Sequence, residues 1–304
     1  MTSGSSPAER VAAVIVHFRT PDETVRAASE VARTAPGVEI VVVDNASRDG
    51  IRARLAQSVP AARVVEEPVN RGYGAACNRG ARETVRPLLL FLNSDAYVRP
   101  GAVEALTAAL DADASAAAAG PRLLDPDGSP QPSIRLLPTP RRILFESSGL
   151  AYLAGGREPF AGHTRVRADH SRAQAVEALM GAALLVRRAA FEAAGGFDEA
   201  FFLYAEETDL MARWRRAGLR ILYVPGAEVV HEGGRSGGDR LFGLLHESLA
   251  RYAAKHHGAT AGAFARAVLA AGAALRYAAA LVTPGDAGRR RRERYRAALG
   301  AHGG

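Results

Sequence analysis

The stretch LLLFLNSDAYVRPG, residues 88–101, is the most informative one about the fold of this chain. Five apolar residues, Leu88–Leu92, form a run of strand length, and the polar triplet Asn93–Asp95 follows it directly. A short apolar run that ends in polar turn formers predicts a strand buried on both faces. Pro100-Gly101 then predict the start of a helix that reaches Asp111. The stretch is therefore typical of one strand–loop–helix unit.

The same unit occurs repeatedly toward the N-terminus. The predicted strands are 11–18, 38–44, 61–67 and 87–92. The predicted helices are 21–34, a short one ending at Gln57, and one that follows Gly72 and reaches about Val85. Apolar runs that alternate with helical segments predict parallel strands whose connecting helices cover both faces of the sheet. We therefore expect an α/β fold with a mostly parallel central sheet.

Polar residues follow four of these predicted strands at the point where each strand ends. They are His17-Phe18, Asp44-Asn45, the segment 70–72 and the segment 93–95. In an open α/β sheet the carboxyl ends of parallel strands lie along one edge, where ligands bind. The sequence therefore predicts a polar ligand-binding crevice at this edge.

The second half of the chain has a different pattern. PRLLDPDGSPQPSIRLLP, residues 121–138, reads as a hairpin with a PDG turn, and 138–170 shows little periodicity and is predicted to be irregular. Further on we expect a strand at 178–188, a helix at 206–217, strands at 219–224 and 228–231, and a helical C-terminal third.

Charge and composition limit the partners and the compartment. A net charge of +7 and a pI near 10 favour anionic partners, such as phosphate groups or an acidic membrane surface. Cys77 is the sole cysteine, which excludes an internal disulfide and a cysteine-based zinc site and fits a reducing cytoplasm. Nothing in the pattern indicates a nucleic-acid partner.

The basic residues are concentrated near the C-terminus, at Arg289–Arg292 and Arg294. This run reads either as a solvated tail or as a contact with anionic lipid. Before it, 259–282 is rich in alanine but interrupted by Arg266 and Arg276, so an amphipathic helix is predicted rather than a membrane-spanning one. Such a helix either packs on the domain or lies on a membrane surface.

Three groups of side chains could carry chemistry. Asp95 is either a turn former or a ligand for a divalent cation that also takes diphosphate oxygens. Glu206, Glu207 and Asp209 stand at a helix start, where acids offset the helix dipole or where one carboxylate serves as a general base. His231, followed by Glu232 and two glycines, is either a structural histidine or a metal ligand.

The order of these motifs resembles the family 2 glycosyltransferases, which are inverting, nucleotide-sugar-dependent enzymes of the GT-A fold. The rhamnosyltransferase-like branch is the most similar. The matching text is VVVDNASRDG, NRGYGAACNRG, LLLFLNSDAYVRPG, LLDPDGSPQPS, MGAALLVRRAAFEAAGGFDEAFFLYAEETDLMARWRRAG and YVPGAEVVHEGGRS. These segments occur in family order between Val11 and Ser236.

The resemblance implies roles for residues at the sheet edge. Asn93-Ser94-Asp95 stands where the family carries its Asp-x-Asp metal motif, with Asn in place of the first Asp, and His231 matches the histidine that completes a Mg²⁺ or Mn²⁺ site. The residues implied to bind the nucleotide sugar are His17, Phe18, Asp44, Asn45, Gly72, Asn78, Asn93, Ser94 and Asp95. The loop after the first strand is His-Phe-Arg here, which departs from the tyrosine or asparagine-rich loop usual in the family.

The catalytic assignments also follow from the resemblance. Glu207 falls where the family has its catalytic base, in a motif more often written Glu-Asp and here Glu-Glu. Gly181, Glu206 and Asp209 are expected around the acceptor, and Asp209 is the second candidate for the base or a support of the helix.

The implied enzyme moves a sugar to a hydroxyl of a glycan, a polyprenyl-linked or a small-molecule acceptor, and resemblance to the branch favours L-rhamnose from dTDP-L-rhamnose. We expect a glycosyltransferase domain at 1–238, with a nucleotide-binding half at 9–120 and an acceptor half at 121–238, and a helical extension at 239–304. A cytoplasmic protein is expected, peripheral on the inner face of an anionic membrane.

Other classes fit less well. A dinucleotide-dependent dehydrogenase needs a glycine-rich turn after the first strand, and HFRTPDE contains no glycine. A sugar-phosphate nucleotidyltransferase also wants a glycine-rich, basic first loop. A non-catalytic nucleotide-sugar or glycan-binding relative is the alternative from another class, and retention of Asp95, Glu207 and His231 argues against it.

Overall fold

The chain divides into two compact units in a computed structural model that describes residues 6–164, 166–233 and 240–300. The first unit comprises Met1–Ile134, Asp169–Ala200 and Glu206–Ser236, and the second comprises Arg135–Ala168, Phe201–Ala205 and Gly237–Gly304. Residues 135–168, expected in the first domain, thus belong to the second unit. The expected boundary at residue 238, like Gly234 and Ser236 of the quoted motif, lies outside the described residues.

The first unit alternates strands and helices. It begins with η1 (Ala8–Arg10), β1 (Val11–His17), α1 (Pro21–Thr34), β2 (Glu39–Asp44), α2 (Ile51–Ser58), β3 (Arg63–Glu66), α3 (Tyr73–Arg82), β4 (Leu88–Asn93), β5 (Ala96–Val98) and α4 (Ala102–Ala112). It continues with β6 (Ala116–Leu124), β7 (Pro130–Gln131), β9 (Gln174–Val176), β10 (Ala178–Leu179), β11 (Ala183–Arg187), α7 (Arg188–Ala193), α8 (Glu206–Arg216) and β12 (Arg220–His231). The short β8 (Ile134–Arg135) stands where the chain passes from the first unit to the second.

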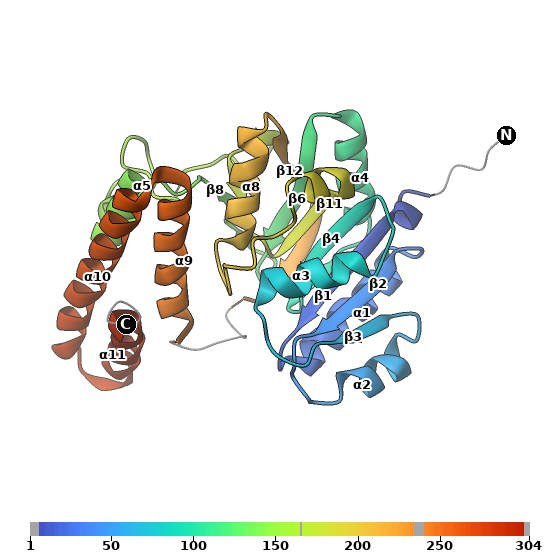
Figure 1. Cartoon of the computed structure of the whole chain (residues 1–304), viewed down its shortest axis with the longest axis horizontal. Coiled ribbons are helices and arrows are strands. Elements are labelled where there is room, and N and C mark those ends of the chain that lie inside the picture. The colour runs from blue at the N-terminus through green and yellow to red at the C-terminus, as the bar shows by residue number, and fades with distance from the viewer. Residues whose placement is uncertain (1–5, 165, 234–239, 301–304) are drawn as a thin grey trace. The chain divides into compact units, whose positions relative to one another are not determined.

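One sheet organises this unit, in the strand order β3-β2-β1-β4-β11-β6-β12-β5 (Figure 1). β3, β2, β1 and β4 are parallel to one another, in a register that pairs Val14 with both Val41 and Phe91. β11 then runs antiparallel to β4 and β6, β12 is parallel to β6, and β5 is antiparallel to β12. The predicted α/β fold is confirmed, with a parallel first half and a mixed second half.

Helices cover both faces of the sheet, as its continuous apolar strands require. α1, α2 and α4 bury their apolar residues with alternate residues of the strands in one core cluster. α3 lies on the opposite face, and Gly80 permits its close approach, because a Cβ there would lie 2.4 Å from Cγ1 of Val14. Phe91, Phe191 and Phe197 pack on one another with ring centroids 5.0–5.5 Å apart.

The predicted elements of the first unit are largely confirmed. The helix predicted at 21–34 is α1, which begins with Pro21 at its first position, and the hairpin of β6 and β7 is antiparallel as expected. The single strand predicted at 178–188 is broken into β10 and β11. The two strands predicted near the end are one, β12, with a register shift between Val224 and Glu228. β5 and β9 were not predicted.

The second unit is helical, with α5 (Pro140–Ser148), α6 (Leu150–Leu153), α9 (Arg240–His257), α10 (Ala259–Leu281) and α11 (Gly285–Gly300). The prediction that 138–170 is irregular was wrong for α5 and α6. Thr139 caps α5 by accepting a hydrogen bond from the N–H of Arg142, and Pro140 is its first residue. Ile143 of α5 is buried with Leu249 and Leu269 in a small core, so packing stabilises a helix that the sequence pattern does not reveal.

α10 is long and apolar enough, by length and composition, to cross a membrane, and 28% of its most apolar window is buried. Arg266 and Arg276 interrupt it. Of the eleven large apolar side chains that are exposed among the described residues, nine belong to the second unit. The second unit therefore carries most of the large apolar side chains that are exposed among the described residues.

Candidate functional site

The carboxyl ends of the parallel strands lie next to one another, as predicted. His17 is the register partner of Asp44, Asp44 is the partner of Glu66, and Val16 is the partner of Asn93. The polar residues that follow β1, β2 and β4 therefore share one edge of the sheet.

His17, the first residue predicted to bind nucleotide, has a fully buried ring. Its Nδ1 lies 2.8 Å from the hydroxyl of Thr24, and its Nε2 lies 3.0 Å from both carboxylate oxygens of Asp49. Both ring nitrogens are thus engaged within the protein. The side chain fixes the loops after β1 and β2 to each other rather than facing the edge. Phe18, the next residue, is half-buried, with the guanidinium of Arg19 5.1 Å from its ring centroid.

Asn45 fixes the loop before α3 in the same way. Its side-chain amide donates to the Asn70 side chain at 2.9 Å and to the Gly72 carbonyl at 3.1 Å, and its Oδ1 accepts from the N–H of Arg71. Gly72 stands at the N-cap of α3. Asp44, also buried, accepts from the N–H of Ser47 at 2.8 Å.

Two more predicted residues fix loops. Asn78 exchanges hydrogen bonds with the backbone of Phe197, donating to its carbonyl and accepting from its N–H, both at 2.9 Å. Ser94 accepts from the hydroxyl of Thr20 at 2.9 Å, which joins the loop after β4 to the loop after β1. Both residues thus help to make the sheet edge rigid. Their contacts with a nucleotide stay predictions.

Asp95 and His231, the predicted metal ligands, come together. β5 pairs with β12 so that Ala96 is the partner of His231, and the carbonyl of Asp95 accepts from the N–H of Glu232. Oδ1 of Asp95 lies 3.5 Å from Nε2 of His231, and both residues are buried. Burial lowers the pKa of His231, although the carboxylates of Asp95 and Asp125 oppose this shift.

The hydrogen bond on the other ring nitrogen decides whether this pair suits a cation. Nδ1 of His231 lies 2.8 Å from Oε1 of Gln131, an atom that only accepts hydrogen bonds, so Nδ1 carries the proton. In the neutral ring Nε2 then presents its lone pair to a carboxylate oxygen. Two acceptors that face each other are suited to a shared divalent cation, so the residues fit such an ion.

Asp95 and His231 do not enclose a cation by themselves. Among residues 6–164, 166–233 and 240–300, no group of three or more His, Cys, Asp and Glu side chains is arranged to hold a metal ion. Diphosphate oxygens of a bound nucleotide would be suitable further ligands of such an ion.

Glu207, the predicted base, lies against Gly181 in the break between β10 and β11. A Cβ on Gly181 would lie 2.9 Å from Cγ and 3.2 Å from Cδ of Glu207. The next residue, Ala182, accepts a hydrogen bond from the N–H of Asn93 at 2.9 Å. The Glu207 carboxylate is therefore brought to the strand end that precedes Asp95.

Gly181→Ala is expected to lower the turnover number of sugar transfer by about 10- to 100-fold, because the new methyl group would displace the Glu207 carboxylate and misplaced catalytic groups cost about that much. The Michaelis constant for the donor should change little. Steady-state kinetics check this, and Gly226→Ala, where a Cβ meets nothing within 4 Å, is the control. An unchanged turnover number in Gly181→Ala would contradict the placement of Glu207.

Glu206 differs from its neighbour because it is buried, with 4% of its surface exposed. Burial and the nearby Glu207 carboxylate raise its pKa well above the usual value. Its Cβ lies 3.5 Å from where a side chain on Gly74 would begin, so it packs against α3 rather than facing solvent. Glu206 is thus a buried acid beside Glu207, in surroundings that favour its protonated form.

Glu206→Gln is expected to make the protein less sensitive to alkaline pH. The folded state holds the Glu206 proton more tightly than the unfolded chain, so its contribution is full below about pH 4 and is lost as pH rises. The free energy of unfolding of the variant minus that of wild type should therefore increase between about pH 5.5 and about pH 8. The increase should be up to about 1.4 kcal/mol per pH unit. Urea unfolding at both pH values measures this; the exposed Glu192→Gln should show no such trend.

Asp209 stabilises the fold through an ion pair. It is fully buried and forms an ion pair with Arg213, whose Nε lies 2.9 Å from Oδ2 of Asp209. Arg213 also donates to the carbonyls of Ala194 and Gly196, so this pair joins α8 to the turn after α7. A carboxylate engaged in this way supports the helix that carries Glu207.

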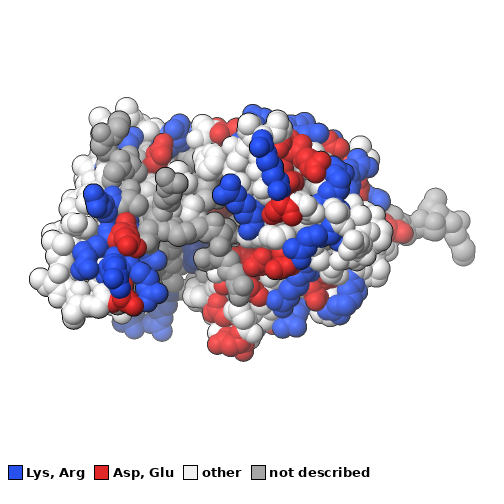
Figure 2. Space-filling view, turned by 90° about the horizontal axis from the view of Figure 1, so that it is seen from below, with Lys and Arg blue, Asp and Glu red and all other residues white. Residues whose placement is uncertain are grey.

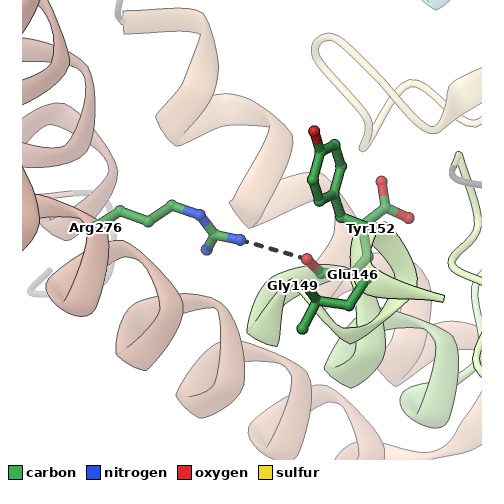
Figure 3. Close-up of a pocket in the computed structure, with 5 residues that line it drawn as sticks. Glu146, Gly149, Tyr152 and Arg276 are labelled. Atoms are coloured by element: carbon green, nitrogen blue, oxygen red, sulfur yellow. Dashed lines mark hydrogen bonds between the residues drawn. The ribbon is translucent and has the colours of Figure 1, made fainter. Parts of the chain in front are cut away.

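The second unit contains a cavity of about 490 Å³, lined by Glu146, Gly149, Tyr152, Leu153 and Arg276. Arg276 extends from α10 to the main-chain oxygen of Glu146, 3.4 Å from its Nη2 (Figure 3). Arg276 also donates to the Gly272 carbonyl. None of the residues predicted to bind the nucleotide sugar or the metal lines this cavity.

The sequence interpretation missed several residues that hold the site. Asp49, Thr20 and Thr24 fix the loops around His17 and Ser94, and Gln131 holds His231. Gln131 stands in the quoted hairpin motif, which was interpreted as two strands and a turn without a role for this residue. A polar residue three positions after the PDG turn was the available signal.

Comparisons with known proteins identify the family of this chain. The family model described as glycosyl transferase family 2 matches residues 13–193. An N-acetylglucosaminyl-diphospho-decaprenol L-rhamnosyltransferase of Mycobacterium tuberculosis is 35% identical over 215 residues, which are 66% of this chain and 68% of that protein. The hexosyltransferase Agl10 of Haloferax volcanii, of low-salt glycan biosynthesis, is 26% identical over 72% of this chain and 66% of that protein.

Among solved structures, the mannosyltransferase PcManGT from Pyrobaculum calidifontis, in complex with GDP-Man and Mn²⁺, is similar with a TM-score of 0.58 at 19% identity. The likeness covers 96% of this chain and 85% of that one and shows a glycosyltransferase fold. The family match spans more than half of the chain, and the mycobacterial relative supports it. The chain therefore belongs to glycosyl transferase family 2.

Proposed function

We propose that this glycosyltransferase moves L-rhamnose from dTDP-L-rhamnose to a hydroxyl group of a lipid-linked glycan, with inversion at the anomeric carbon. The observation that carries the proposal is the position of Gly181, which brings the Glu207 carboxylate to the strand end that precedes Asp95. We therefore assign a base and a cation-binding pair to the sheet edge where ligands of such folds bind.

Glu207 acts as the general base. It accepts the proton of the acceptor hydroxyl while that oxygen attacks the anomeric carbon and the bond to the nucleoside diphosphate breaks on the opposite face. Glu206, which packs against α3, and the Asp209–Arg213 pair hold the helix that carries Glu207. Because α8 and the Gly181 segment hold Glu207, positioning contributes to the rate.

Asp95 and His231 would hold Mg²⁺ or Mn²⁺. Bound there, a divalent cation offsets the charge of the diphosphate leaving group. The neutral His231 ring and the Asp95 carboxylate supply the two donor types that suit such an ion, and the solved relative from Pyrobaculum calidifontis was obtained with Mn²⁺.

The donor and the acceptor are proposed from the mycobacterial relative. Its name gives an L-rhamnosyl group and an N-acetylglucosaminyl-diphospho-decaprenol, a sugar on a polyprenyl diphosphate carrier. A comparable carrier for this chain would present its hydroxyl at a membrane surface. A soluble small-molecule acceptor is the competing choice.

A panel of nucleotide sugars tests the proposal. The protein is titrated calorimetrically with dTDP-L-rhamnose, UDP-glucose, UDP-N-acetylglucosamine and GDP-mannose, each with and without Mn²⁺. We then expect transfer from dTDP-L-rhamnose to a synthetic polyprenyl-diphospho-N-acetylglucosamine, followed by mass spectrometry. Preference for another donor would overturn the rhamnosyl assignment, and tight donor binding with neither transfer nor hydrolysis would indicate a non-catalytic relative.

The second unit is proposed to contact an anionic membrane, which gives a cytoplasmic protein that is peripheral on the inner face. α11 contains six arginines and two acids, and Figure 2 shows basic side chains gathered at the left of the view. Arg292 donates to the Ala280 carbonyl at 2.9 Å, which fixes α11 beside the end of α10. Leu281 and Val282, 58% and 84% exposed, lie at that end. Apolar and basic side chains side by side are typical of a membrane-surface contact.

Arg290→Glu/Arg291→Glu is expected to weaken binding to phosphatidylglycerol-containing vesicles at least about 30-fold, since each basic residue contributes about 1 kcal/mol near such a surface. Vesicle co-sedimentation measures this, and raising the salt concentration should weaken wild-type binding as well. Arg82→Glu/Arg99→Glu is a matched control with exposed arginines of the first unit. Equal loss in both double variants would show that net charge alone matters.

A further inference from the structure

We propose that Asp125 and Gln131 are positioning residues that set the tautomer of His231 and so aim its Nε2 lone pair at the cation site. The three side chains form a continuous chain that ends at Asp95. Oδ1 of Asp125 lies 2.8 Å from Nε2 of Gln131, Oε1 of Gln131 lies 2.8 Å from Nδ1 of His231, and Nε2 of His231 lies 3.5 Å from Oδ1 of Asp95. The inference rests on the proposed cation site at Asp95 and His231.

Asp125 determines which way the Gln131 amide points. An ionised carboxylate only accepts hydrogen bonds, so the NH₂ group of Gln131 must face it. A flipped amide would place two acceptor oxygens 2.8 Å apart. The fixed amide therefore presents Oε1 to His231, and this oxygen requires a proton on Nδ1. The tautomer of His231 therefore follows from its hydrogen-bond partners, because Asp125 leaves one orientation for the Gln131 amide and that amide leaves one position for the proton on the ring.

The fold keeps these residues in place. β7, which carries Gln131, pairs with β6 so that Gln131 is the register partner of Leu123, and Leu123 is in turn the partner of Val229 on β12. The hairpin is closed by the N–H of Asp125, which donates to the Ser129 carbonyl at 2.8 Å. Gln131 and His231, 100 residues apart in the sequence, are thus brought together by β7 and β12, which both pair with β6.

The tautomer of His231 decides whether its Nε2 atom can bind a cation. With the proton on Nδ1, Nε2 is available to a metal ion without any proton loss, and the hydrogen bond to Nδ1 orients the ring. With the other tautomer, Nε2–H would donate to Asp95 and close the site. Groups that orient a ligating histidine in this way typically change metal affinity about 10- to 100-fold when removed.

Gln131→Leu tests this, because leucine is of similar size and neither donates nor accepts. The first readout is ¹⁵N NMR of the metal-free protein at about pH 7.5, with the His231 signals assigned by their loss in His231→Asn. We expect the Nδ1–H form in wild type and a shift toward the Nε2–H form in Gln131→Leu. The second readout is Mn²⁺ titration by calorimetry, where we expect a loss of affinity of about 10- to 100-fold. Gln57→Leu, an exposed residue of α2, is the control.

The exchange Asp125→Asn/Gln131→Glu reverses the polarity of the first hydrogen bond and keeps the net charge. The introduced asparagine amide would donate to the introduced glutamate carboxylate, which still accepts from Nδ1–H of His231. We therefore expect the Nδ1–H form and Mn²⁺ affinity within about threefold of wild type. A wild-type ring in the Nε2–H form would overturn the inference, as would an unchanged tautomer in Gln131→Leu. If wild type shows the Nδ1–H form but binds no Mn²⁺, the cation site fails and the tautomer assignment stands.

Discussion

Glu207→Gln is expected to lower the rate of sugar transfer about a thousandfold while the affinity for the nucleotide-sugar donor stays within about threefold of wild type. The amide keeps the size and most contacts of the side chain but cannot accept a proton at neutral pH. Loss of a general base typically costs between about 10²- and 10⁴-fold in rate. Because Glu207 lies against Gly181 and not within the frame around Asp44 and Asn45, the donor site should remain intact.

Single-turnover kinetics with the nucleotide sugar that the protein prefers measure the rate of sugar transfer. Calorimetry measures the binding of that donor. Glu192→Gln carries the same chemical change on an exposed residue of α7 and is expected to transfer sugar at the wild-type rate. A Glu207→Gln enzyme that retains full transfer would remove Glu207 from the mechanism. A parallel loss of donor affinity would instead assign it to donor binding.

The fold could be predicted from the sequence wherever burial on both faces dictates the pattern. β1, β2 and β4 are continuous apolar runs, and Pro21 marks the start of α1. α5 could not be predicted in this way, because it buries Ile143 alone in full and depends on a small core formed with α9 and α10. β5 is three residues long and follows the predicted turn at once, so no periodicity distinguishes it from a loop.

The candidate site shows the same limit at the level of side chains. Residue type and position at strand ends predict that His17, Asp44 and Asp95 share an edge, and the register confirms their placement. The pattern does not reveal that His17 is turned inward to Thr24 and Asp49, because a histidine at a strand end is compatible with either direction. Hydrogen-bond partners from distant segments decide this, and such pairs have no local signal.

Glu207 and Gly181 illustrate a second reason why the site could not be fully predicted from the sequence. The motif text identifies both residues, yet only the break between β10 and β11 shows that the missing side chain of Gly181 makes room for the carboxylate. Gly181 matters because a side chain there would occupy the space that the Glu207 side chain fills. Sequence reasoning names such residues by resemblance and cannot assign their physical function.

Asp95→Asn is expected to lower Mn²⁺ affinity at least about 100-fold and sugar transfer at least about 1,000-fold, and at the same time to leave the metal-free protein as stable as wild type or more so. The first two effects follow from loss of the carboxylate charge. The third follows from the tautomer of His231, since the new amide would donate to the Nε2 lone pair that now faces a carboxylate oxygen at 3.5 Å. A hydrogen bond gained there is worth about 1 kcal/mol.

Calorimetric Mn²⁺ titration, transfer assays and thermal unfolding in excess chelator measure the three effects. Asp111→Asn is the matched control, because it removes a carboxylate that pairs with Arg10 on the surface; it should lose some stability and keep its Mn²⁺ affinity. Retained Mn²⁺ binding in Asp95→Asn would exclude Asp95 as a ligand. A clear loss of stability in chelator would show that Asp95 is bonded to a protonated His231, so that the pair is a structural ion pair rather than a cation site.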